Sequence, residues 1–225
     1  TSITLTVAFF NSLSGSIAYA RQKRIDYRSG LSFALTAVPG AILGAYLVEY
    51  LSRSIFQYIF ASILLLIAVY ITIHPEKKMS SGFLNMWQTS RNISNIDGDV
   101  HRYKFNLPLG MTISFFVGVV SGLLGIGGGI IHVPALTQIL GFPAHIATAT
   151  SHFMVAVTTL SAIITHLVSH TFTGDVGRAL VLSVGAVVGA QFGARLSRKV
   201  SGKVIVRLLA LGLSIVALRL LISPL

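Results

Sequence analysis

The sequence predicts an all-α polytopic membrane protein. Hydrophobic residues make up 53% of the 225 positions and charged residues only 10%, whereas an ordinary globular chain carries about 25% charged residues. Apolar segments of about 20 residues, the length that a transmembrane helix needs, recur along the chain. They are too long for barrel strands and lack the alternation that such strands show. A soluble domain, a disordered chain and, since cysteine is absent, a disulfide-stapled secreted module are excluded.

The apolar segments define the membrane helices that we expect. Segment 130–141 is too short to span a bilayer and follows a glycine cluster, which predicts a short or tilted helix or a re-entrant piece. Residues 74–105 are polar and predict a linker outside the membrane. The other predicted spans are 3–20, 29–51, 55–73, 107–126, 146–169, 178–196 and 204–225.

An internal repeat organises these segments. An offset of 149 residues aligns residues 1–73 with residues 150–222 without a gap, and the alignment pairs Asp26 with Asp175. We therefore expect a first repeat at 1–73, a linker at 74–105 and a second repeat at 106–225. The second repeat has a leading hairpin before Thr150 that the first repeat lacks, which predicts a further 40-odd residues ahead of Thr1 in the full-length protein.

Loop charges predict that the two repeats have inverted topologies. Loop 21–28 holds four Lys/Arg residues and its counterpart 170–177 none, whereas loop 195–203 is basic and the loop after Leu47 holds only Arg53. Since Lys and Arg in short loops favour the cytoplasmic side, loops 21–28 and 195–203 and the linker are predicted there. The net charge of +11 is thereby explained without nucleic acid as a partner.

The sharpest motif is a glycine cluster in the second repeat. Residues 125–129 read Gly-Ile-Gly-Gly-Gly and precede Pro134, a pattern that breaks a helix. A broken helix at membrane depth faces protein or a cavity, and its free N–H groups favour an anion. The predicted substrate-binding residues are Gly127, Gly128, Gly129, Thr150, Ser151 and His152, with Thr1 and Ser2 as symmetry mates of Thr150 and Ser151.

The alternative interpretation of these glycines is close helix packing, because small residues dominate membrane interfaces. A packing or hinge role is predicted for Gly125, Pro134, Gly40, Gly44, Gly189 and Gly193. No Lys-Ser/Thr follows the cluster and no strand precedes it, so a phosphate loop is excluded.

Polar residues inside apolar segments are further candidates. His152 is predicted to contact the anion or to relay a proton. The alternative is a neutral histidine that forms a hydrogen bond with a neighbouring helix. Asn11 and Gln191 are expected to form interhelical hydrogen bonds. No metal-ligand spacing is present, and no cofactor is predicted.

The motif resembles that of the sulfite exporter TauE/SafE family of bacterial membrane permeases. The similarity runs through Ser121–Gly129, Val133-Pro134, Gly141-Phe142-Pro143 and Ala149-Thr150-Ser151, and through residues 15–19 and 24–28 of the first repeat. The resemblance implies export of sulfite, organosulfonates or related anions. The family's first copy of the glycine motif is absent, so half of the implied site has no counterpart here.

The predicted function is a secondary transporter in the bacterial inner membrane that holds a small inorganic or organic sulfur anion between inverted repeats. Its predicted partners are that anion and the lipid bilayer; proton or ion coupling and a homodimer are left open. An assembly subunit without transport is one alternative. An intramembrane hydrolase using Ser151 or Ser121 is another, disfavoured because consecutive Ser151 and His152 point about 100° apart on a helix.

Overall fold

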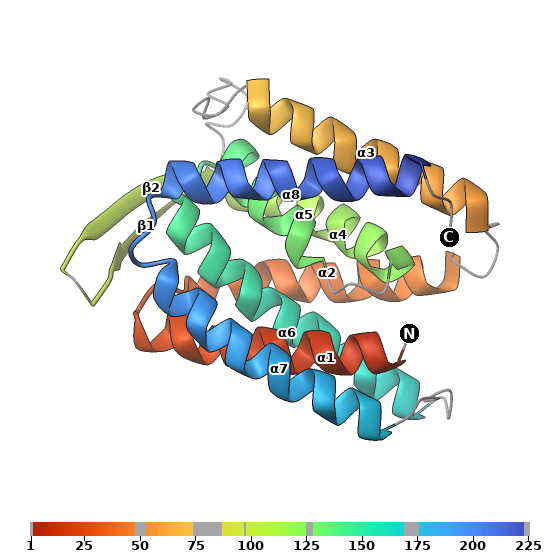
Figure 1. The fold of residues 1–225 in the computed structure, drawn as a ribbon. Coiled ribbons are helices and arrows are strands. Elements are labelled where there is room, and N and C mark those ends of the chain that lie inside the picture. Colours follow the sequence, from red (N-terminus) through yellow and green to blue (C-terminus); the bar gives the residue numbers. More distant parts are fainter. Residues whose placement is uncertain are drawn as a thin grey trace.

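A computed structural model describes residues 2–47, 53–73, 87–96, 98–124, 128–168 and 176–222, most of them in helices (Figure 1). The elements follow the predicted segments closely. The first three helices are α1 (Ser2–Arg21), α2 (Tyr27–Leu47) and α3 (Arg53–Ile73), followed by strands β1 (Gln88–Ser94) and β2 (Val100–Asn106). The second half holds α4 (Leu107–Leu124), α5 (Gly129–Pro134), a π-helical turn (Ala135–Ile139), α6 (Ala144–Val168), α7 (Val176–Leu196) and α8 (Gly202–Ile222).

The all-α membrane fold class is confirmed. Four helices among the described residues are long and apolar enough to span a membrane, namely Ile3–Arg21, Tyr27–Leu47, Ala144–Thr165 and Gly177–Leu196. Helix α1 packs against α6 and α7, α2 against α4 and α6, and α3 against α8. Figure 1 shows α3 and α8 side by side over the layer that contains α2 and α4.

The helix bounds follow the repeat. Adding 149 to the bounds of α2 gives Val176–Leu196, and adding 149 to those of α3 gives Gly202–Ile222, which are the bounds of α7 and α8. In Figure 1 the colours of α3 and α8 progress in opposite directions along their axes, so these equivalent helices run antiparallel. The inverted orientation of the repeats relative to a membrane stays a prediction.

Glycines set the contact between α2 and α4. A Cβ added to Gly40 or Gly44 would overlap backbone oxygens of α4, and one added to Gly118 or Gly122 would overlap those of α2. Absence of side chains therefore lets the two backbones touch, as small residues do at membrane helix interfaces.

The packing role predicted for Gly189 and Gly193 stays a prediction. These residues are the symmetry mates of Gly40 and Gly44, yet a Cβ at either position meets nothing within 4 Å. Among the described residues no helix lies on this face of α7 as α4 lies on α2.

The linker contains a β-hairpin that the sequence analysis did not predict. Strands β1 and β2 pair antiparallel, with Arg91 opposite Tyr103. Along β2 exposed and buried residues alternate, and Tyr103 and Phe105 are buried in an aromatic cluster with Phe33 of α2 and Phe142. The hairpin thus shares a core with the helices and belongs to the same folded unit.

A buried carboxylate, Asp26, joins the hairpin to the helices. Its Oδ1 accepts the backbone N–H of Ser29 at 3.1 Å, which caps the first turn of α2. Its Oδ2 accepts the hydroxyls of Ser29 at 2.6 Å and Tyr103 at 2.8 Å, and lies 3.7 Å from Arg91 Nε. The backbone N–H of Asp26 donates to Thr150 Oγ1 at 3.1 Å. One residue therefore links α2, α6 and both strands.

Ionisation of the Tyr103 hydroxyl is expected to destabilise the folded protein at alkaline pH. Burial, followed by the neighbouring Asp26 carboxylate, raises the pKa of Tyr103, so its neutral form is retained on folding. A raised folded pKa gives stability that is complete below the unfolded value of about 10 and is lost as pH rises beyond it. We expect the melting temperature to fall more steeply above about pH 10 in wild type than in Tyr103→Phe. Thermal unfolding across that range measures the effect, and equal slopes would contradict it.

Candidate functional site

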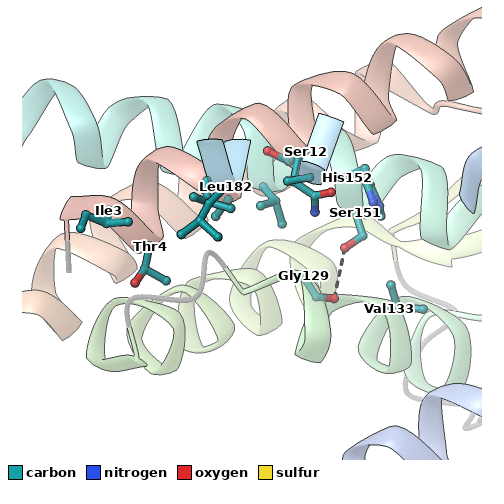
Figure 2. A pocket seen from close by; sticks show the side chains of 13 residues that line it. Ile3, Thr4, Ser12, Gly129, Val133, Ser151, His152 and Leu182 are labelled. Carbon is teal, nitrogen blue, oxygen red and sulfur yellow. Dashed lines mark hydrogen bonds between the residues drawn. The ribbon is translucent and has the colours of Figure 1, made fainter. Parts of the chain in front are cut away.

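A cavity of about 580 Å³ lies between α1, α5, α6 and α7 (Figure 2). We refer to it as the central cavity. Helix α1 contributes one face of its first half, and α5, α6 and α7 contribute residues of the second repeat. The lining residues are Ile3, Thr4, Val7, Ala8, Asn11, Ser12, Gly129, Val133, Ser151, His152, Val155, Leu182 and Ala186. Both repeats therefore build the cavity.

Polar groups gather at one end of the central cavity. Figure 2 shows Ser12, Ser151 and His152 close to Gly129, whereas Ile3 and Thr4 lie toward the opposite end. The hydroxyl of Ser151 donates to the carbonyl oxygen of Gly129 at 3.3 Å, and that of Ser12 donates to its own helix. This end offers hydrogen-bonding groups, and the rest of the cavity is lined by apolar side chains together with Thr4 and Asn11, a mixture that is common in small-molecule sites.

The glycine motif forms part of the cavity wall at this polar end. Gly128 precedes α5 with φ +74°, a left-handed conformation that favours glycine, and a Cβ there would lie 3.0 Å from Ser121. Its carbonyl oxygen accepts the N–H groups of Ile131 and His132. Gly129 follows as the first residue of α5 and lines the cavity.

Pro134 lies where the helix changes its geometry. It cannot donate a backbone hydrogen bond, and the chain continues from it into a π-helical turn in which the N–H of Leu140 donates to Ala135 O. Such turns frequently occur at functional sites. The predicted short helix of segment 130–141 is thus confirmed as α5 with a π-helical extension.

His152 is held in a defined orientation. Its Nδ1 lies 3.1 Å from the carbonyl oxygen of Thr148, one turn earlier in α6. Its ring lies against Gly15, where a Cβ would overlap it, and packs edge-on against Tyr19 with ring centroids 5.3 Å apart. Helix α1 therefore fixes the ring at the polar end of the cavity.

The structure brings together only part of the predicted substrate site. Gly129, Ser151 and His152 line the cavity, and Gly128 directly precedes it. Thr1, Gly125 and Gly127 lie outside the described residues, and for Ser2 the description covers the backbone alone.

Thr150, which is also predicted to bind the substrate, does not line the described cavity. Its side chain is fully buried, and its Oγ1 accepts the N–H of Asp26 away from the cavity. Successive helical residues point about 100° apart, so Thr150 faces the start of α2 while Ser151 faces α5.

The polar residues inside the apolar helices have two kinds of surroundings: some form hydrogen bonds between helices, and others line the cavity. The interhelical role of Gln191 is confirmed, since its Nε2 donates to the backbone oxygen and hydroxyl of Ser14 at 2.8 and 3.0 Å. Asn11, expected to do the same, lines the cavity instead. Thr4 and Ser12 were also missed as lining residues. An available signal was their spacing with Asn11 along one face of α1.

His132, another membrane histidine, packs inside the protein. Its side chain is 2% exposed and its Nδ1 lies 3.1 Å from Gly128 O. It is not among the residues that line the cavity. It therefore stabilises the start of α5 from the side that faces away from the cavity.

Ser151 is not paired with a histidine base as a catalytic serine nucleophile would be. Its hydroxyl donates to Gly129, while Nδ1 of His152 faces Thr148 O, so no serine–histidine pair joins them among the described residues. In the same part of the chain no three His, Cys, Asp or Glu side chains are grouped to hold a metal ion.

Comparisons with known proteins agree with a membrane transporter rather than an enzyme. The probable membrane transporter protein YunE of Bacillus subtilis (strain 168) is 31% identical over 170 residues, which are 74% of this chain and 60% of that relative. The alignment thus spans about three-fifths of the relative's length. No solved structure matches. A family model described as sulfite exporter TauE/SafE matches residues 1–220. The chain belongs to the sulfite exporter TauE/SafE family.

Proposed function

We propose that this chain forms a secondary transporter for small sulfur-containing anions, sulfite or organosulfonates, in the bacterial inner membrane. The observation that carries the proposal is the central cavity, to which α1 of the first repeat and α5, α6 and α7 of the second contribute. Family membership supports the substrate class.

The lining groups suit a small oxyanion in part. The side chains of Thr4, Asn11 and Ser151 are hydrogen-bonding groups of the kind that fix a polar ligand, while valine and leucine side chains make up the walls. A substrate held between two inverted repeats is exposed alternately when one repeat rocks against the other. An inside-negative potential favours exit of an anion by about 2.3 kcal/mol per charge per 100 mV, so we propose export.

Flux in proteoliposomes tests the proposal. We expect purified protein to move radiolabelled sulfite, and unlabelled organosulfonate to compete better than sulfate or acetate. Absence of flux for every anion would favour an assembly subunit without transport.

A cavity-filling substitution gives a matched comparison. Ala186 lines the cavity, whereas Val188 lies on the same helix and is 49% exposed. Phenylalanine at position 186 occupies substrate volume, so Ala186→Phe is expected to lower sulfite flux by more than about tenfold, whereas Val188→Phe keeps it. Equal flux in the two variants would place the transport path elsewhere.

A further inference from the structure

We propose that each transported anion moves together with one proton, carried on Nε2 of His152. The inference rests on the proposed transport function and adds its coupling ion and the atom that holds it. It starts from the charge of the central cavity. Among the described lining residues none is Lys, Arg, Asp or Glu, and His152 alone can become a cation in the physiological pH range.

The geometry identifies the nitrogen that exchanges the proton. A carbonyl oxygen only accepts hydrogen bonds, so the contact between Thr148 O and Nδ1 at 3.1 Å keeps a hydrogen on Nδ1. Nε2 is then the nitrogen that gains or loses a proton. Neutral His152 has a lone pair at Nε2, which repels an anion's oxygen, whereas the imidazolium has an N–H that donates to it.

Burial makes the two binding events interdependent. An anion against mostly apolar walls without a countercharge carries a desolvation cost. The proton on Nε2 supplies that countercharge, and the anion in turn stabilises the imidazolium. Linkage is reciprocal, so the anion raises the affinity for the proton by the factor by which the proton raises that for the anion, typically 5–150-fold for coupled sites.

No other ionisable group near His152 replaces this function. Tyr19 contacts the ring through its aromatic edge, and a phenol supplies no positive charge. The charged groups on neighbouring elements are not among the residues that line the cavity. The titratable groups on elements packed against α6, or sharing the cavity with it, are Tyr19 and Arg21 of α1, Lys23, Arg24 and Asp26 before α2, Tyr27, Arg28 and Tyr46 of α2, His132 of α5, Arg178 and Arg195 of α7, and Lys203, Arg207 and Arg219 of α8.

The proton balance of a transport cycle follows. As the anion enters, Nε2 binds a proton from the solution on the loading side, and imidazole becomes imidazolium. On the opposite side the anion leaves and Nε2 returns the proton to water. A monovalent anion therefore crosses with no net charge, and its own concentration gradient together with the pH difference sets the direction of its movement. A divalent anion keeps one negative charge, on which an inside-negative potential still acts outward.

Methanesulfonate is a suitable probe because it stays a monoanion across the pH range in which histidine titrates. We expect wild-type proteoliposomes to acidify internally as methanesulfonate enters, with about one proton per anion, and entry to be insensitive to membrane potential. Flux should rise by about tenfold between about pH 8 and about pH 5.5. A pH-sensitive dye in the lumen and a potassium–valinomycin clamp give the two readouts.

His152→Gln keeps a hydrogen-bond donor but cannot take up a proton. We expect this variant to lose the acid stimulation and to make its residual flux sensitive to voltage. His101→Gln on β2, outside the cavity, is the matched control and should retain the wild-type pH profile. Because His152→Gln can fail to fold, proton uptake by wild-type protein on adding methanesulfonate in weakly buffered detergent is measured independently.

The outcomes separate the two proposals. Wild-type methanesulfonate flux that carries net charge, methanesulfonate binding without proton uptake, or a folded His152→Gln variant that keeps the acid stimulation would overturn proton coupling while leaving transport intact. If neither sulfite nor methanesulfonate moves, the transport proposal fails, and the coupling fails with it.

Discussion

Gly44→Leu is expected to separate α2 from α4 and to destabilise the protein by about 3 kcal/mol or more. A side chain at this position would enter the carbonyl oxygen of Val119, which is backbone and cannot rotate away. For a chain of this size, that loss corresponds to a melting temperature lower by about 6–12 °C. Thermal unfolding followed by circular dichroism, with size-exclusion chromatography, measures it.

The symmetry mate of Gly44 supplies the control. Gly193 occupies the same place in α7, and a Cβ there meets no atom of the described residues within 4 Å. Both substitutions gain the same helix propensity, about 1 kcal/mol over glycine, so that contribution cancels. We expect Gly193→Leu to change stability by less than about 1 kcal/mol. Equal destabilisation of the two variants would show that α7 is as tightly covered as α2.

Asp26→Ala is expected to be the most damaging substitution outside the membrane helices, with a loss of about 3 kcal/mol. It removes the acceptor for the Tyr103 hydroxyl and the charge beside Arg91, and it uncaps α2. The hairpin should then detach from the helices, because its polar anchor is lost. A lower melting temperature together with faster proteolysis between residues 88 and 106 measures both effects.

Asp99→Ala provides the comparison. Asp99 lies on the hairpin, where its carboxylate accepts a hydrogen bond from Asn95 at 3.1 Å and is exposed. Exposed interactions of this kind contribute little, so we expect a change below about 1 kcal/mol. If Asp26→Ala were no more harmful than Asp99→Ala, the Asp26 cluster would not hold the hairpin in place.

The connection through Asp26 also has a functional side. Thr150 is bonded to Asp26, and the next two residues of α6, Ser151 and His152, line the cavity. The hairpin is thus attached within one helical turn of the proposed site. Loss of the hairpin contact is therefore expected to disturb transport as well as stability.

Much of the fold could be predicted because membrane helices follow from local composition. Long apolar runs have one stable solution in lipid, so the span limits were close to the observed helices, and the 149-residue offset reproduced the bounds of α7 and α8 from α2 and α3. The hairpin escaped prediction because its strands alternate over only seven residues each. What stabilises it is burial of Tyr103 and Phe105 against distant helices, which a local pattern does not contain.

The candidate site was predictable only in outline. The glycine cluster and the Ser151-His152 pair could be found because small and ionisable residues are conspicuous in apolar segments. Asn11 and Ser12 could not be assigned to the cavity from the sequence. The face of α1 that they share lines a cavity only because α5, α6 and α7 pack around it, and the sequence of α1 does not contain that arrangement.

The sequence by itself determined the class of the protein, the positions of its long helices and its family, since each follows from composition or from residue order. Only the tertiary structure decided which equivalent residues share a role. Gly44 and Gly193 have the same place in their repeats, yet within the described part of the chain only Gly44 is covered by another helix. Thr150 and Ser151 are neighbours that face different partners. The physical reason is that packing depends on what lies against a helix face, and that is settled by elements distant in the chain.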